Sequence, residues 1–167
     1  MAISYLKKSK KARQLIDTLE ESEITFTITF TKDASSFTPD TQTININIYL
    51  GLVLIDGIST QSVAMAIAHE MGHACQYAMG IYEWLPGKGN KMNREELNLI
   101  MFETPIAKEL GEPVRRRYDD NVGFRYMENP IWFITAGSHS IFFYFWPGNW
   151  GEPWEYPVYH NRGWPWQ

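Results

Sequence analysis

The sequence contains an H-E-x-x-H pattern at residues 69–73, and this pattern constrains the fold because its chemistry is carried on a helix. Ser59 or Thr60 can cap the start of such a helix, and small and straight-chain residues fill its middle. Gly80 can end it in the left-handed conformation. The segment from Ser59 to Gly80 is therefore predicted to contain one long helix that carries the whole pattern.

The polar side chains of the pattern are predicted to share one face of this helix. Side chains advance by about 100° per residue, so His73 lies about 40° from His69, and Glu70 about 100° from it. Two imidazoles one turn apart can bind a zinc ion, and the glutamate can accept a proton from the metal's water. The alternative is a structural helix whose histidines only form hydrogen bonds, so the rest of the chain must supply a third ligand. The far face is predicted to be buried and comprises Val63, Ala64, Ile67, Met71, Ala74 and Ala78.

Composition narrows the class of protein. A chain of 167 residues suits one domain, and a formal net charge of −4 argues against a protein that binds nucleic acid by general attraction. The basic residues at positions 7–13 fit a solvated helix face. The single cysteine, Cys75, excludes an intrachain disulfide and is predicted to lie in the core. The longest apolar run, residues 48–55, is too short to span a membrane, and no signal-peptide pattern is present, so we expect a soluble protein.

Patterns outside the central helix predict an α+β fold. Residues 4–19 have the spacing of an amphipathic helix, and the alternating runs 24–31 and 43–48 predict half-buried strands. We expect these strands to form an antiparallel hairpin that packs on the central helix. The remaining signals are a turn at Asp56-Gly57, a loop at Pro86–Asn90, a capped helix start at Asn93–Leu97 and a short helix from Thr104 to Gly111.

A third metal ligand is expected among the acidic residues that follow the central helix. Met79 and Gln76 occupy the places where a metzincin has its third histidine and its glycine, so that class is excluded. His139 and His160 lie far along the chain in an aromatic segment. The remaining candidates are Glu95, Glu96 and Glu103.

Helix geometry allows only one of Glu96 and Glu103 to bind the ion. The two residues are seven apart and share a face, but on a straight helix they are separated by a rise of about 10 Å. One is expected to be the ligand, and the other to hold a histidine or an arginine by a hydrogen bond. Glu96 also fits a purely structural role, as the glutamate of a capping box that begins at Asn93.

The order of these motifs resembles the active sites of bacterial toxin zinc proteases. In the clostridial neurotoxin light chains, the second glutamate of a Glu-Glu-Leu motif is the third ligand, and a later glutamate precedes an Arg-x-x-Tyr pair. Here Glu95-Glu96-Leu97 is followed by Glu103, by Arg115 twelve residues later, and by Tyr118. This arrangement implies that His69, His73 and Glu96 bind Zn²⁺.

The sequence is closer in size to the NleD-like family of effector metallopeptidases, which occur as type III effectors and as toxin domains of Rhs-type polymorphic toxins. The pattern of that family is similar to residues 103–115, except at Thr104 and Ala107, where asparagine and a basic residue are usual. The resemblance covers residues 1–118 and implies a small zincin-like fold. We therefore expect a single domain at 1–167, with a catalytic core at 1–118 and an aromatic, irregular C-terminal segment at 119–167.

The resemblance also implies the roles of the remaining site residues. Glu70 would be the general base, and Glu103 would support a zinc ligand or serve as an alternative one. Arg115 and Tyr118 would donate hydrogen bonds to the charge that develops on the scissile carbonyl. Because residues 115–117 are all arginine, the assignment of Arg115 is open by one position.

Residues 119–167 hold most of the aromatic residues of the chain. The apolar run Ile141–Trp146 predicts a buried strand, and the tryptophans and tyrosines that follow lie among proline and glycine. The segment could be packing that wraps the catalytic core, which we favour, or a surface that binds a partner.

Two functions from different classes are therefore expected. The first is a zinc endopeptidase that acts as a bacterial toxin or effector on a protein in a target cell. Its partners would be a polypeptide substrate and a cognate immunity protein, with no nucleic acid and no membrane span. It would be cytoplasmic in the producer and then secreted without a classical signal peptide. The alternative is an inactive zincin scaffold that binds a protein through its aromatic C-terminal surface.

Overall fold

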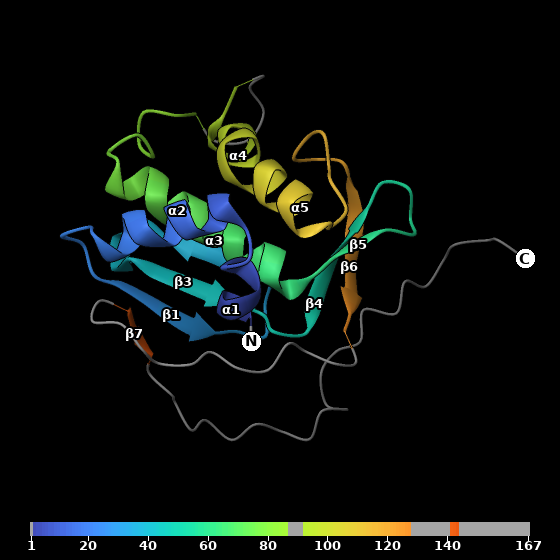
Figure 1. Ribbon diagram of the computed structural model, residues 1–167, viewed down its shortest axis with the longest axis horizontal. Helices are drawn as coiled ribbons and strands as arrows, with labels where there is room; N and C mark the ends of the chain where they lie inside the picture. Colours follow the sequence, from blue (N-terminus) through green and yellow to red (C-terminus); the bar gives the residue numbers. More distant parts are fainter. Residues whose placement is uncertain (1, 87–91, 128–140, 144–167) are drawn as a thin grey trace, which may run out of the picture.

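The computed structural model describes residues 2–86, 92–127 and 141–143 and has an α+β fold. Its helices lie together over one face of a four-stranded sheet, and a three-stranded sheet stands beside them (Figure 1). The elements are α1 (Ala2–Leu6), α2 (Lys10–Glu20), β1 (Phe26–Phe30), β2 (Ser36–Thr38), η1 (Pro39–Thr41), β3 (Thr43–Ile46), β4 (Leu50–Leu54), β5 (Thr60–Gln61), α3 (Val63–Ala78), α4 (Arg94–Asn98), η2 (Leu99–Glu103), α5 (Thr104–Leu110), β6 (Asn121–Tyr126) and β7 (Ile141–Phe143). The predicted α+β class is confirmed, and the zincin-like fold stays a prediction.

Helix α3 carries the H-E-x-x-H pattern and lies at the centre of the packing. It contacts α1, α2, α4 and α5 as well as strands β2 to β5. Every residue from Val63 to Gln76 except Ala66 is buried, including Cys75 as predicted. Because the polar face is enclosed along with the apolar one, the histidines and Glu70 require polar partners inside the protein.

The start of α3 differs from the prediction. Thr60 and Gln61 form β5, so the helix begins later, with Ser62 rather than Ser59 or Thr60 as its N-cap. Gly80 follows the helix with a positive φ of 70°, as predicted. The predicted N-terminal helix is likewise divided in two, because Ser9 caps a new start by accepting a hydrogen bond from the Ala12 amide at 2.9 Å.

The four-stranded sheet has the order β2-β3-β1-β7 and corrects the expected hairpin. Strands β1 and β3 are neighbours, but they run parallel, with Ile28 opposite Ile44. The antiparallel prediction is wrong because the loop between them contains β2, which turns back through η1 and pairs antiparallel with β3. The chain therefore reverses twice between β1 and β3. On the other edge, β7 pairs parallel with β1.

The three-stranded sheet has the order β5-β4-β6. The predicted turn at Asp56-Gly57 is confirmed between β4 and β5, where the Asp56 carboxylate accepts hydrogen bonds from the Ile58 and Ser59 amides. Strand β6 corrects the expectation that residues after 118 are irregular. The strand predicted at Ile141–Trp146 is confirmed for the three residues of β7. His139, His160, most of the loop at Pro86–Asn90 and the rest of the aromatic segment lie outside the described residues.

The helical stretch from α4 to α5 contains a π-turn. In this turn, η2, the Thr104 amide bonds to the Leu99 carbonyl five residues earlier. Pro105 follows directly; it lacks an amide hydrogen, and its ring crowds the carbonyl four residues before it. A π-turn adds about one residue to the helix, which rotates the side chains before it by about 100° relative to those after it. The helix then ends at Gly111, whose φ is 71°.

Gly72 lets the helix that contains α4 and η2 approach α3 closely. A Cβ atom at this position would overlap the Asn98 side-chain oxygen and would lie 3.1 Å from Phe102 Cδ2. The Asn98 side-chain nitrogen, which is buried, donates to the His69 carbonyl at 2.7 Å. The absence of a side chain at Gly72 thus places the glutamate-bearing helix directly against the H-E-x-x-H pattern.

We expect Gly72→Ala to lower the free energy of unfolding by about 1–3 kcal/mol, because a methyl group is forced into a packed contact. Chemical denaturation of wild type and variant measures this difference. Asn98→Ala removes the atoms that the methyl group would overlap, so Gly72→Ala should cost clearly less in that background. The same cost in both backgrounds would show that the close contact is not the cause.

No helix in the described part of the chain combines the length and the apolarity needed to cross a membrane.

Candidate metal centre

Two histidines of α3 and one glutamate of α4 bring their side-chain atoms to a common point. His69 Nε2 and His73 Nε2 are 3.2 Å apart, and Glu95 Oε2 lies 3.3 Å from the first and 3.0 Å from the second. The histidines are buried, and Glu95 is partly buried. Glu96 does not reach this point, so the expectation that Glu96 is the third member of the group is corrected to Glu95.

The spacing of the three atoms suits a metal ion. Around a tetrahedral zinc ion with bonds of about 2.0–2.1 Å, neighbouring ligand atoms are about 3.3 Å apart. The three observed separations lie within a few tenths of an ångström of that value. Two imidazoles and a carboxylate also suit other divalent metals. The group could therefore hold a metal ion, but its donor atoms are not specific to zinc.

The π-turn explains why Glu95 rather than Glu96 faces the histidines. In an uninterrupted α-helix, residues seven apart share a face, which would align Glu96 with Glu103. The extra residue of η2 shifts the alignment to residues eight apart, Glu95 and Glu103. Both contact His69, Glu95 at Nε2 (3.3 Å) and Glu103 at Nδ1 (2.8 Å).

Glu96 is turned away from the histidines. Its carboxylate accepts a hydrogen bond from the Tyr118 amide at 3.0 Å, and its own amide donates to the Asn93 side chain at 2.9 Å. Asn93 is thus the N-cap of α4, as predicted. Glu96 fixes the main chain at Tyr118, which is a supporting role.

Glu103 is enclosed by hydrogen-bond donors. It is 1% exposed and accepts from Arg115 at 2.7 Å and 2.6 Å and from the Gln61 side chain at 3.0 Å. One carboxylate therefore orients the His69 ring and neutralises a buried guanidinium. This geometry agrees with the expected supporting role of Glu103 behind a metal ligand.

Arg115 is the buried member of the three adjacent arginines, while Arg116 and Arg117 are exposed. Two of its guanidinium nitrogens donate to Glu103, and the third donates to the Tyr118 carbonyl at 2.7 Å. In this structure Arg115 therefore holds Glu103 and the Tyr118 main chain in place. A direct contact between Arg115 and a scissile carbonyl stays a prediction.

Tyr118 lies beside the candidate metal centre. Its ring stacks on the His69 ring with 5.7 Å between centroids and 27° between planes. Burial and the nearby Glu95 carboxylate raise the pKa of the Tyr118 hydroxyl to about 12. The hydroxyl is therefore protonated at neutral pH and able to donate a hydrogen bond.

The charges at the centre favour a cation among the three ligand atoms. Burial alone would lower the pKa of His69, but its hydrogen bonds to Glu103 and Glu95 outweigh burial and raise the pKa to about 9. Burial alone would raise the pKa values of Glu103 and Glu95, but their hydrogen bonds to His69 outweigh burial. The pKa of Glu103 is lowered to about 2, and that of Glu95 is held well below its usual range. Both carboxylates stay ionised, so a proton or a metal ion is stabilised between them and the imidazoles.

Glu70 is buried next to the histidines, with 7% of its surface exposed. Burial raises the pKa of its carboxyl group, and the neighbouring His69 and His73 and the Phe37 amide partly oppose this effect. Glu70 also lines a cavity of about 280 Å³ together with His69 and Tyr118. A buried carboxylate with a raised pKa beside a candidate metal centre has the properties of a general base.

Gln76 is a site residue that the sequence analysis did not assign to the centre. Its side chain is fully buried; its amide nitrogen donates to the Arg94 carbonyl at 2.9 Å, which leaves its oxygen facing His73 Nδ1 at 3.0 Å. The Nδ1–H of His73 therefore donates to Gln76, and Nε2 is the ring nitrogen that could bind a metal ion. Gln76 lies three residues after His73, and this helical spacing is the signal that could have identified it.

We expect Gln76→Ala to weaken metal binding by about 10–100-fold, the usual cost of losing a residue that orients a ligand. The reason is that His73 and the Arg94 carbonyl, adjacent to Glu95, lose their common partner. Competition with a zinc-binding dye measures the dissociation constant. Gln14→Ala, an exposed position on α2, is the control, and equal affinities of the two variants would contradict the role of Gln76.

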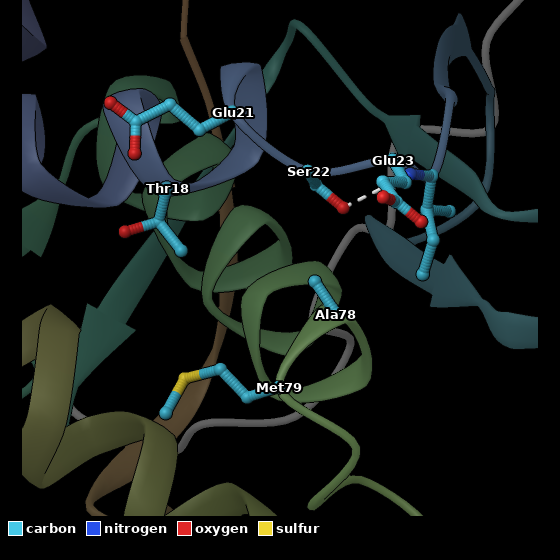
Figure 2. A pocket seen from close by; sticks show the side chains of 7 residues that line it. Thr18, Glu21, Ser22, Glu23, Ala78 and Met79 are labelled. Atoms are coloured by element: carbon cyan, nitrogen blue, oxygen red, sulfur yellow. Dashed lines mark hydrogen bonds between the residues drawn. The ribbon is translucent and has the colours of Figure 1, made fainter.

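A second hollow, of about 360 Å³, lies where the end of α2 meets the end of α3 (Figure 2). Thr18, Ser22 and Met79 line it, together with the carboxylates of Glu21 and Glu23. Both glutamates are exposed, and the described residues around the hollow include neither histidine nor cysteine. The groups able to perform chemistry gather instead at the cavity beside Glu70.

Comparison of the chain with protein-family models, with curated proteins and with solved structures finds no match.

Proposed function

We propose that this protein is a zinc-dependent endopeptidase. The observation that carries the proposal is the position of Glu70, a buried carboxylate that lines the same cavity as His69, one member of the His69, His73 and Glu95 group. Two imidazoles with a glutamate ligand and an adjacent general base are the parts that hydrolysis of a peptide bond requires. Bound zinc would act as a Lewis acid and lower the pKa of a water molecule to about 7.

Each side chain around the candidate metal centre would have its own role in the reaction. Glu70 would accept a proton from the attacking water and return it to the leaving amine. The Tyr118 hydroxyl, which is neutral, would donate to the negative charge that develops on the carbonyl oxygen. Glu103 and Gln76 would hold the two imidazoles, and Arg115 would hold Glu103.

Other uses of the same ligand set are less well supported. Two histidines and a carboxylate also hold iron(II) in oxygenases. Oxygenase chemistry has no use for a carboxylate base buried beside the histidines, whereas hydrolysis requires one. The inactive scaffold likewise has no use for Glu70, so the geometry favours the hydrolase over both alternatives.

We also propose that the endopeptidase acts as a secreted bacterial toxin or effector in a target cell. This part of the proposal rests on the order of motifs shared with NleD-like metallopeptidases. It implies a polypeptide substrate, a cognate immunity protein, a cytoplasmic location in the producer and a route of export. Glu95 takes the ligand position that the resemblance assigns to Glu96.

The experiment that tests the proposal is a search for new protein termini. Purified protein is incubated with the proteins of a cell lysate as prepared, after removal of metal by a chelator, and after return of zinc. New termini identified by mass spectrometry should appear with zinc, disappear with the chelator and return when zinc is restored. A protein that binds zinc stoichiometrically and yields no new termini in lysates or in expressing cells would overturn the proposal.

A further inference from the structure

The cavity beside Glu70 has an apolar wall. Strands β4 and β6 pair antiparallel with Leu52 opposite Phe124, so these two side chains and Leu50 project from one face of the sheet. All three line the cavity. Leu50 and Leu52 are half-buried, and Phe124 is 55% exposed. The partly open face of an antiparallel sheet usually carries polar side chains, so this apolar row is suited to contact with a ligand.

The wall continues onto α3 up to the candidate metal centre. Met65 and Ala66 line the same cavity, and Ala66 lies one helical turn before Glu70. The cavity volume of about 280 Å³ is just below the range of pockets that enclose small molecules, about 300–1,000 Å³. The space therefore suits the side chain of one or two residues of a peptide held near Glu70.

The charges around the cavity disfavour an acidic side chain. Arg115 is the one cation among the described lining residues apart from His69, and its nitrogens already donate to Glu103 and to the Tyr118 carbonyl. Glu70 and Glu103 add carboxylates. Against the apolar side chains of Leu50, Leu52 and Phe124, an acidic side chain would lose water without gaining a hydrogen-bond partner.

We propose that the wall of Leu50, Leu52 and Phe124 binds an apolar side chain of the substrate, on a residue next to the bond that is cut. This inference rests on the proposed peptidase activity and specifies its substrate class: polypeptides with leucine, methionine or phenylalanine beside the scissile bond, and not aspartate or glutamate. In apolar pockets, a single methylene changes kcat/KM by about 10–200-fold. Leucine should therefore be preferred over aspartate by at least that factor.

The test compares two lysine substitutions on β6. Phe124→Lys places a cation in the wall, whereas Val122→Lys changes a residue two positions away that is 48% exposed and does not line the cavity. Each zinc-loaded protein is given a peptide library in which the residues flanking the cut are varied. Phe124→Lys should lower the preference for leucine over aspartate at least tenfold, and Val122→Lys should leave it unchanged.

A binding measurement separates this inference from the peptidase proposal. The affinities of zinc-loaded protein for leucine hydroxamate and aspartate hydroxamate are measured by calorimetry. Cleavage without a preference for apolar residues, or identical cleavage preferences of the two lysine variants, would contradict the role of the wall in substrate binding. The peptidase proposal would remain. If leucine hydroxamate binds more tightly than aspartate hydroxamate, Phe124→Lys removes this difference and no peptide is cleaved, the apolar wall is supported and the peptidase proposal is wrong. Equal affinities without cleavage would overturn both.

Discussion

Glu70→Gln is expected to leave zinc binding intact and to lower the rate of peptide hydrolysis by about 10²–10⁴-fold, the usual contribution of a general base. Glutamine has nearly the same shape as glutamate, but its amide cannot accept the proton of the attacking water. The His69, His73 and Glu95 group does not include Glu70, so zinc content should be unchanged. Because burial already disfavours the charged form of Glu70, a neutral amide should not unfold the protein.

The control for this variant is Glu23→Gln, which changes an exposed carboxylate in the second hollow. Rates of peptide cleavage, zinc content and thermal unfolding are measured for all three proteins. Wild type and Glu23→Gln should be equally active. If Glu70→Gln cleaved peptides or harmed target cells as well as wild type, the hydrolytic mechanism would be wrong, and the aromatic C-terminal segment would become the candidate for function.

The sequence allowed accurate prediction of features that depend on neighbouring residues. The helix around His69 and His73, the cap at Asn93 and the glycine ends of α3 and α5 follow from local propensity and are confirmed. Such features need no knowledge of the rest of the fold.

The features that could not be predicted depend on contacts between distant segments. The periodicity of β1 and β3 shows that they are strands, but not that β2 would separate them and make them parallel. The same limit applies to β6, which pairs with a strand about 70 residues earlier in the chain. Alternation defines the two faces of a strand and leaves its partner undefined.

The incorrect assignment of Glu96 in place of Glu95 has a different cause. The helix that carries both residues is shifted in phase by one residue. The assignment of Glu96 came from the resemblance, and it agreed with a helix of 3.6 residues per turn, which aligns Glu96 with Glu103. The π-turn before Pro105 breaks that alignment, and sequence periodicity does not reveal where such a turn occurs. Two adjacent glutamates made the pattern especially sensitive to this shift.

The phase shift leads to the second prediction: Glu95→Ala should abolish stable zinc binding, whereas Glu96→Ala should leave it near the wild-type level. Glu95 Oε2 is one of three candidate ligand atoms, so its loss should weaken affinity by more than the about 10–100-fold expected for a supporting residue. Glu96→Ala removes a hydrogen bond to the Tyr118 amide, which is worth about 1 kcal/mol of stability.

Adjacent positions, the same residue type and the same substitution make these two variants matched controls for each other. Zinc content by elemental analysis and affinity by dye competition distinguish them, and denaturation curves show whether either is unfolded. If Glu96→Ala lost zinc and Glu95→Ala retained it, Glu96 would be the ligand. The helix would then bind metal as a regular α-helix, without the π-turn. The two variants therefore test the helical phase and the ligand assignment together.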